Sequence, residues 1–140
     1  MTDAPGYVGG RILDVGALVQ LATGGSIYAR ALMASAASRG QALVVSTAAL
    51  MAARAVSDAG ARAQLHVLLD LGPIVPALLT LADAEAAGDL LATASLARIA
   101  PDLAAAHVVW LALHRHQRIV TDRPDALRHV APTVEVDELP

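Results

Sequence analysis

Short apolar runs alternate with helix-length stretches along this 140-residue chain, and the alternation limits the folds that it can adopt. The predicted strands are 11–14, 43–45, 74–75, 119–120 and 133–136, the last at a sheet edge. The predicted helices are 16–22, 27–39, 47–56, 59–71, 80–97, 101–116 and 125–130. Strands separated by helices pair in parallel, and the crossover helices cover both faces of the sheet. The sequence therefore predicts a three-layer α/β/α sandwich with a mostly parallel central sheet, in one domain spanning 1-140.

Alanine rather than aromatic residues supplies much of the apolar content. The chain is 56% hydrophobic but only 2% aromatic, with no phenylalanine, and its mean hydropathy is +0.54. Such thin side chains favour close packing of helices. No apolar run reaches the roughly 18 residues that a membrane helix needs, and the N-terminus lacks the basic start and apolar core of a signal peptide. We therefore expect a cytoplasmic protein without a membrane span.

Charge and cysteine content restrict the chemistry. A net charge of −3 gives no general attraction to nucleic acid, so any contact with RNA would need a local basic patch. The absence of cysteine excludes disulfides and thiolate metal sites, and any metal would need carboxylate or imidazole ligands. Neither a phosphate-binding glycine loop nor a Gly-x-Ser-x-Gly elbow is found, so nucleophilic catalysis is unsupported.

Polar residues follow two of the predicted strands. Asp14 ends the first strand, and Thr121-Asp122-Arg123-Pro124-Asp125 follows the strand 119–120. Open parallel sheets place their ligand sites at the carboxyl ends of the strands. The two segments are therefore predicted to meet in one pocket.

Over residues 8–138 the chain resembles PIN domains, the small α/β nucleases that include the VapC-type toxins of bacterial toxin–antitoxin modules. The resemblance rests on the order and spacing of four segments: 12–18, 71–88, 106–109 and 118–127. It implies three or four acidic residues that hold one or two Mg²⁺ or Mn²⁺ ions and hydrolyse an RNA backbone. It also implies, as partners, an antitoxin-like protein, RNA and a second copy of the chain in a homodimer.

The chain departs from this family pattern at most of the acidic positions. Asp14 and Asp125 stand in register as metal ligands, whereas the second and third acids fall on Ala52 and Ala105. Arg123 takes the place of an aspartate in the last motif. If its guanidinium points into the pocket, it would occupy the space and charge role of the missing ion and pair with Asp14.

Two further aspartates lie close to family positions. Asp102 precedes Ala105 by one helical turn, and Asp122 is displaced by one position from Arg123. Gly16 replaces a small polar residue and removes a hydroxyl that could position a metal or water. We therefore expect a degenerate site with a binding or regulatory role. The alternatives are an active Mg²⁺- or Mn²⁺-dependent endoribonuclease with a rearranged cluster, for which the catalytic residues would be Asp14, Asp102, Asp122 and Asp125, or a purely structural assembly protein.

Structural interpretations of the same residues stay open. Asp14 at a strand end could cap the following helix, and Asp102 suits the start of a helix, where the dipole favours an acid. His107, among apolar residues, is typical of a core histidine. Trp110 has helical spacing for packing, with base stacking as the alternative. The acidic tail 135–138 is interpreted as a solvated end.

Overall fold

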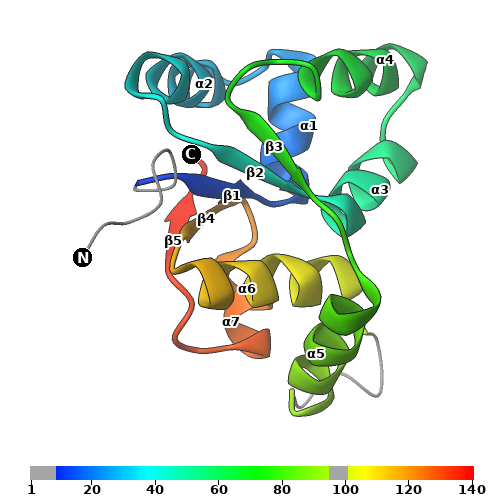
Figure 1. Cartoon of the computed structure of the whole chain (residues 1–140). Coiled ribbons are helices and arrows are strands. Elements are labelled where there is room, and N and C mark those ends of the chain that lie inside the picture. Colours follow the sequence, from blue (N-terminus) through cyan, green and yellow to red (C-terminus); the bar gives the residue numbers. More distant parts are fainter. Residues whose placement is uncertain (1–8, 95–100) are drawn as a thin grey trace.

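The computed structural model describes residues 9–94 and 101–140, and in it a five-stranded sheet lies between two layers of helices (Figure 1). The strands are β1 (Arg11–Leu13), β2 (Leu43–Ser46), β3 (Ile74–Ala77), β4 (Arg118–Thr121) and β5 (Val136–Glu138). The helices are α1 (Val15–Thr23), α2 (Ile27–Arg39), α3 (Thr47–Ala55), α4 (Ala59–Leu68), α5 (Leu81–Ala92), α6 (Leu103–Arg115) and α7 (Pro124–Val130). Neighbouring strands pair in parallel. The predicted α/β/α sandwich is confirmed.

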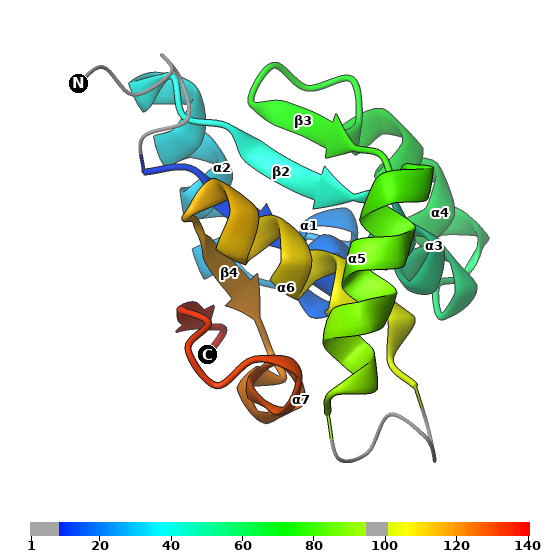
Figure 2. The same ribbon diagram turned by 60° about the horizontal axis from the view of Figure 1, so that its bottom comes forward.

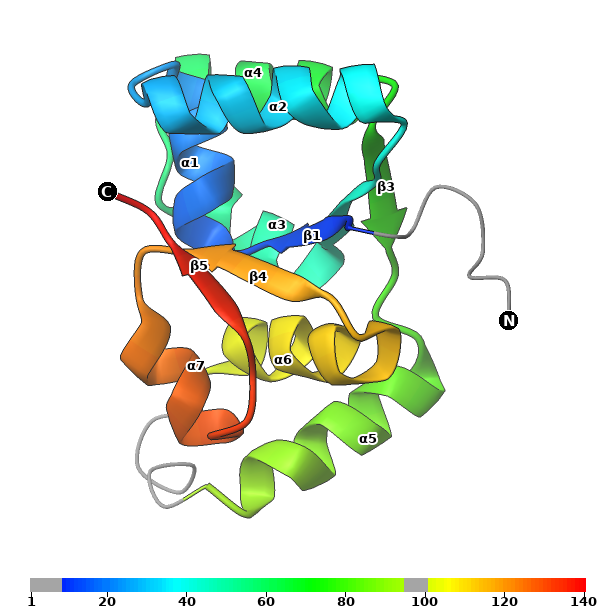
Figure 3. The same cartoon turned by 90° about the vertical axis from the view of Figure 1, so that its left-hand side faces the viewer.

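The order of the strands is β3-β2-β1-β4-β5, so the chain builds the sheet outward from β1 in two directions. Helices α1, α2 and α4 cover one face, and α5, α6 and α7 cover the other (Figure 3). Helix α3 contacts both α1 and α6, and α5 packs on the outside of α6 (Figure 2). The strand order reverses between β1 and β4, and the carboxyl ends at such a switch point are where open parallel sheets form a crevice.

The core is built on three central strands and on small helical residues. Side chains of β1, β2 and β4 that are completely buried are Ile12, Leu13, Val44, Val45, Ile119 and Val120. Buried alanines on the facing helices are Ala17, Ala29, Ala36, Ala49, Ala53, Ala105 and Ala106. The methyl groups let helices approach the sheet closely, as the composition predicts.

The predicted helix boundaries are largely confirmed by their caps. The Ser26 hydroxyl accepts a hydrogen bond from the Ala29 amide at 3.2 Å at the start of α2, and Gly40 ends this helix with a φ of 64°. Helix α4 ends at Leu68, earlier than predicted, because the following residues form a turn. Helix α5 ends at Ala92, where the predicted helix continued to 97. The Thr93 hydroxyl donates to the Leu90 carbonyl at 2.8 Å there, and residues 95–97 lie outside the described chain.

The sequence predicts the last strand at 133–136, and these bounds are wrong because the strand begins at Val136. Strand β5 spans Val136–Glu138 and pairs with β4 so that Asp137 lies opposite Val120. The interpretation of the acidic tail as a solvated end is also wrong for Asp137, because two arginines bind its carboxylate. The Asp137 side chain of this strand forms ion pairs with Arg11 and Arg118, which are distant in the sequence. A local pattern of apolar residues does not indicate these partners.

None of the described helices is long and apolar enough to cross a membrane.

Candidate functional site

The carboxylate of Asp14 lies at the carboxyl end of β1, where the sheet order reverses. Asp14 is completely buried, and its amide donates to the Val120 carbonyl at 3.0 Å. Its backbone has the extended geometry of a helix N-cap for α1, but its side chain makes no capping hydrogen bond within the described chain. The carboxylate instead points to residues that follow β4.

Arg123 binds both oxygens of this carboxylate. Its Nε donates to Oδ2 of Asp14 at 2.9 Å, and its Nη2 donates to Oδ1 at 3.0 Å. The planar guanidinium fork matches a carboxylate in this two-point arrangement. The bonds to Asp14 raise the pKa of Arg123, although burial opposes the shift. The arginine is therefore a permanent cation beside a buried anion.

Thr121, at the end of β4, completes the binding of Asp14. Its hydroxyl donates to Oδ2 of Asp14 at 2.8 Å and accepts from the Arg123 amide at 3.0 Å. One completely buried side chain thus fixes both the carboxylate and the backbone of its arginine partner. We did not predict this role for Thr121, although its position directly after a strand paired with β1 is a usable signal.

Asp102 belongs to the same cluster and also caps a helix. Its Oδ1 accepts from the Ala105 amide at 2.9 Å at the start of α6, while its Oδ2 accepts from Nη1 of Arg123. The structural interpretation of Asp102 as a helix-start residue is therefore confirmed, and its catalytic role stays a prediction. Arg123 thus joins two carboxylates that are 88 positions apart in the sequence: Asp14 follows β1, and Asp102 precedes α6.

Gly16 leaves room for Asp122. A Cβ atom added to Gly16 would lie 2.3 Å from Cγ of Asp122, so any side chain at position 16 would displace this carboxylate. Asp122 itself is exposed. The absence of a side chain at Gly16, where the family has a small polar residue, thus leaves the space that the Asp122 carboxylate occupies.

Asp125 forms no ion pair with Asp14, Asp102 or Arg123 among the described residues. It occupies the first turn of α7 and is exposed. No hydrogen bond or ion pair joins it to Asp14 among the described residues. The structure therefore brings together Asp14 and Asp102 through Arg123 and places Asp122 nearby.

A cleft of about 450 Å³ lies between α1, α3 and the start of α6. Its walls are mostly apolar, and its polar side chains come from Gln20, Asp102, Asp122 and Arg123. The lining residues are Val15, Gly16, Val19, Gln20, Ala52, Val56, Asp102, Ala104, Asp122 and Arg123. Ala52, which stands at the position of the second family acid, contributes a methyl group here, while Ala105 is completely buried in α6. Most of the cleft wall is therefore suited to contact with apolar groups.

This donor set does not fit a divalent cation. Both oxygens of Asp14 already accept hydrogen bonds, and the guanidinium would repel a cation placed beside them. The described part of the chain contains no group of three or more histidine, aspartate or glutamate side chains arranged to hold a metal. In the observed arrangement, Arg123 is the charge partner of both Asp14 and Asp102.

A second polar pair lies in the core beside the cleft. The Ser46 hydroxyl, at the start of α3, lies 2.7 Å from Nδ1 of His107 on α6. Both residues are completely buried, so no substrate reaches the hydroxyl. Nε2 of His107 has no hydrogen-bond partner in the described residues. His107 is a core histidine, as its apolar surroundings suggest.

The side chain of Trp110 packs against residues of α5 and α6. Its Nε1 donates to Asp83 on α5 at 3.2 Å, and its ring stacks on His114 with centroids 5.4 Å apart. The bond to Asp83 joins α5 to α6 on the face of the sheet opposite to α1, whereas the stack on His114 lies within α6.

No protein-family model matches this chain, and a comparison with curated proteins finds no significant match either.

Proposed function

We propose that this chain is a PIN-like domain in which an arginine has replaced the catalytic metal, and that its cleft binds another protein instead of hydrolysing RNA. The observation that carries the proposal is the two-point bond of Arg123 to Asp14. The resemblance to PIN domains supplies the comparison, since Ala52 and Ala105 stand where that family has acids.

Metal-dependent hydrolysis needs carboxylate oxygens that are free to hold the ion which activates water. In Asp14, three hydrogen bonds from Arg123 and Thr121 occupy three of the roughly four lone-pair sites of the carboxylate. A buried carboxylate also needs a charge partner, and Arg123 provides it without a metal. The pair therefore keeps the site folded in the absence of the ions that the family implies.

The walls of the cleft indicate what such a domain can still do. Val15 and Val19 of α1, Ala52 of α3 and Val56, which directly follows α3, all line the cleft. Burial of apolar side chains from a partner in such a groove is the usual source of binding energy. We propose as partners an antitoxin-like protein or a second copy of this chain, in the cytoplasm.

The second candidate is an active Mg²⁺- or Mn²⁺-dependent endoribonuclease with a rearranged cluster. It is favoured by the position of Asp102 and Asp122 on the same cleft, and it requires Arg123 to leave Asp14. This candidate thus needs a movement of Arg123 that the first one does not.

RNA cleavage by the purified protein with Mg²⁺ or Mn²⁺ separates the two. We expect the wild-type protein to cleave RNA no faster than Asp14→Asn, and added chelator to change neither rate. Cleavage that requires the metal and disappears in Asp14→Asn would establish the nuclease instead.

A further inference from the structure

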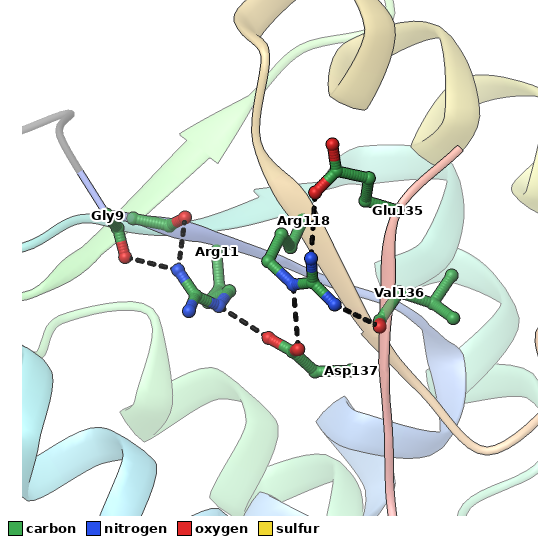
Figure 4. Close-up of polar contacts among 7 residues, drawn as sticks. Gly9, Arg11, Arg118, Glu135, Val136 and Asp137 are labelled. Carbon is green, nitrogen blue, oxygen red and sulfur yellow. Dashed lines mark hydrogen bonds and ion pairs between the residues drawn. The ribbon is translucent and has the colours of Figure 1, made fainter. Parts of the chain in front are cut away.

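The C-terminal strand β5 is held to the sheet by a network of ion pairs (Figure 4). Oδ2 of Asp137 accepts from Nε of Arg11 at 2.6 Å, and Oδ1 accepts from Nε of Arg118 at 2.8 Å. Arg118 also donates from Nη1 to Glu135 at 2.7 Å and from Nη2 to the Val136 carbonyl at 2.7 Å. One side chain of β5 thus bridges two arginines on β1 and β4.

The two arginines need an anion between them. Arg11 and Arg118 are directly paired on neighbouring strands, and like charges in this position destabilise a sheet. Asp137 relieves that repulsion. Burial opposes ionisation of this carboxyl, yet the bonds from Arg118 and Arg11 hold the pKa of Asp137 below its usual value. The carboxylate is therefore charged in neutral solution and bound on both sides.

Apolar burial contributes little within β5 itself. Val136 and Asp137 are only partly buried and Glu138 is exposed, whereas β1 has completely buried Ile12 and Leu13. The buried apolar residues in this region, Val134 and Leu139, flank the strand. Ion pairing is thus the main contribution of the side chains of β5, in addition to its backbone pairing with β4.

The end of β5 is bonded to the residue that organises the cleft. The Leu139 amide donates to the Thr121 carbonyl at 2.8 Å, and the hydroxyl of the same Thr121 binds Asp14 and the Arg123 amide. Thr121 therefore lies between the C-terminal strand and the Arg123–Asp14 pair.

We propose that β5 is a charge-held latch for the cleft: while it is docked it fixes Thr121 and hence Arg123 on Asp14, and its release loosens that end of the cleft. The inference rests on the proposed function only in taking the cleft as the site that is regulated. Salt or loss of the Asp137 charge is the releasing condition, because both remove the attraction to Arg11 and Arg118.

Asp137→Asn in the full chain tests the latch, with Glu138→Gln as the matched control. Glu138 is the next residue of the strand, and no ion pair is found for it among the described residues. We expect Asp137→Asn to raise the amide exchange rate of Leu139 by about tenfold or more, as for a locally opening segment. We expect the Arg123 Nε–H proton to exchange faster in the same variant. Amides of Ile12 and Leu13 and all rates in Glu138→Gln should stay at wild-type values.

A salt series on the wild-type protein gives the same test without a substitution. Raising the salt from about 0.01 M to about 1 M shortens the Debye length from about 30 Å to about 3 Å. Exchange at Leu139 and at Arg123 Nε should rise together with salt. Unchanged Leu139 exchange in Asp137→Asn and in high salt overturns the latch, and faster Leu139 exchange with an unchanged Arg123 signal overturns its link to the cleft. These exchange rates do not depend on whether the cleft binds a protein or cleaves RNA, so the latch and the proposed function fail separately.

Discussion

Arg123 holds Asp14 by two parallel hydrogen bonds, from Nε to Oδ2 at 2.9 Å and from Nη2 to Oδ1 at 3.0 Å. The two residues come from the ends of β4 and β1, the strands between which the sheet order reverses. At the position where other α/β proteins bind a ligand, this chain thus pairs a buried carboxylate with one of its own side chains.

Removal of the arginine should cost stability. Arg123→Ala leaves a completely buried carboxylate without its charge partner, and we expect the free energy of unfolding to fall by about 3 kcal/mol. Urea denaturation at neutral pH measures the change. The control Arg128→Ala removes an exposed arginine from the same region of the chain and should change stability by less than about 0.5 kcal/mol. Equal effects of the two variants would show that the pair with Asp14 is not structural.

Gly16 and Gly88 should respond in opposite ways to alanine. Gly16→Ala places a methyl group against the Asp122 carboxylate and should destabilise the protein by about 1 kcal/mol. Gly88 lies in α5 with no atom within 4 Å of an added Cβ, so Gly88→Ala should stabilise by about 1 kcal/mol through helix propensity. Thermal denaturation compares them. If the contact is responsible, Asp122→Ala in the Gly16→Ala background restores the lost stability.

The core histidine should make stability depend on pH. Burial, opposed by Asp83 and aided by Arg115, lowers the pKa of His107 from its ordinary value of 6.5. The unfolded chain therefore binds this proton at a higher pH than the folded chain. The contribution of His107 is complete above pH 6.5 and is lost as the pH falls towards the lowered folded pKa.

Urea denaturation between about pH 8 and pH 5 detects this loss. His107→Asn should flatten the pH dependence in this range, whereas His66→Gln, which alters an exposed histidine on α4, should leave it unchanged. A wild-type slope that survives in His107→Asn would assign the effect to another group.

His116 is a site where glycine should stabilise. It ends α6 with a φ of 53°, a left-handed conformation that costs an ordinary residue about 1 kcal/mol. His116→Gly should therefore gain about 0.5–1 kcal/mol. His114→Gly, two residues earlier within the helix, should instead lose about 1 kcal/mol. Calorimetric melting of the two variants gives the signs, and a loss for both would contradict the account of this helix end.

The fold could be predicted because its signals are local. Cap residues such as Ser26 and Gly40 mark the ends of a helix. Such helices separate the apolar runs that become β1, β2 and β4, and this separation favours a parallel sheet. Strand β5 lacked such a signal. Its register depends on an ion pair between Arg11 and Asp137 across 126 positions, and nothing in the tail 133–138 encodes that partner.

The site was predicted in part. The order of the segments anticipated the meeting of Asp14 with Arg123, because both follow strands that end at the same edge. The dual role of Thr121 and the packing of Asp122 on Gly16 depend on side-chain directions, which spacing does not specify. Register with a family motif suggests Asp125 as a ligand; it lies in the first turn of α7, and its role as a ligand stays a prediction.

The central claim, that a guanidinium stands in place of the metal, is tested most directly by calorimetric titration with Mn²⁺. We expect no heat of binding for the wild-type protein and a measurable, saturable heat for Arg123→Ala, in which Asp14 and Asp102 lose their cation and Asp122 remains beside them. Mn²⁺ binding by the wild-type protein that is abolished in Asp14→Asn would contradict the account.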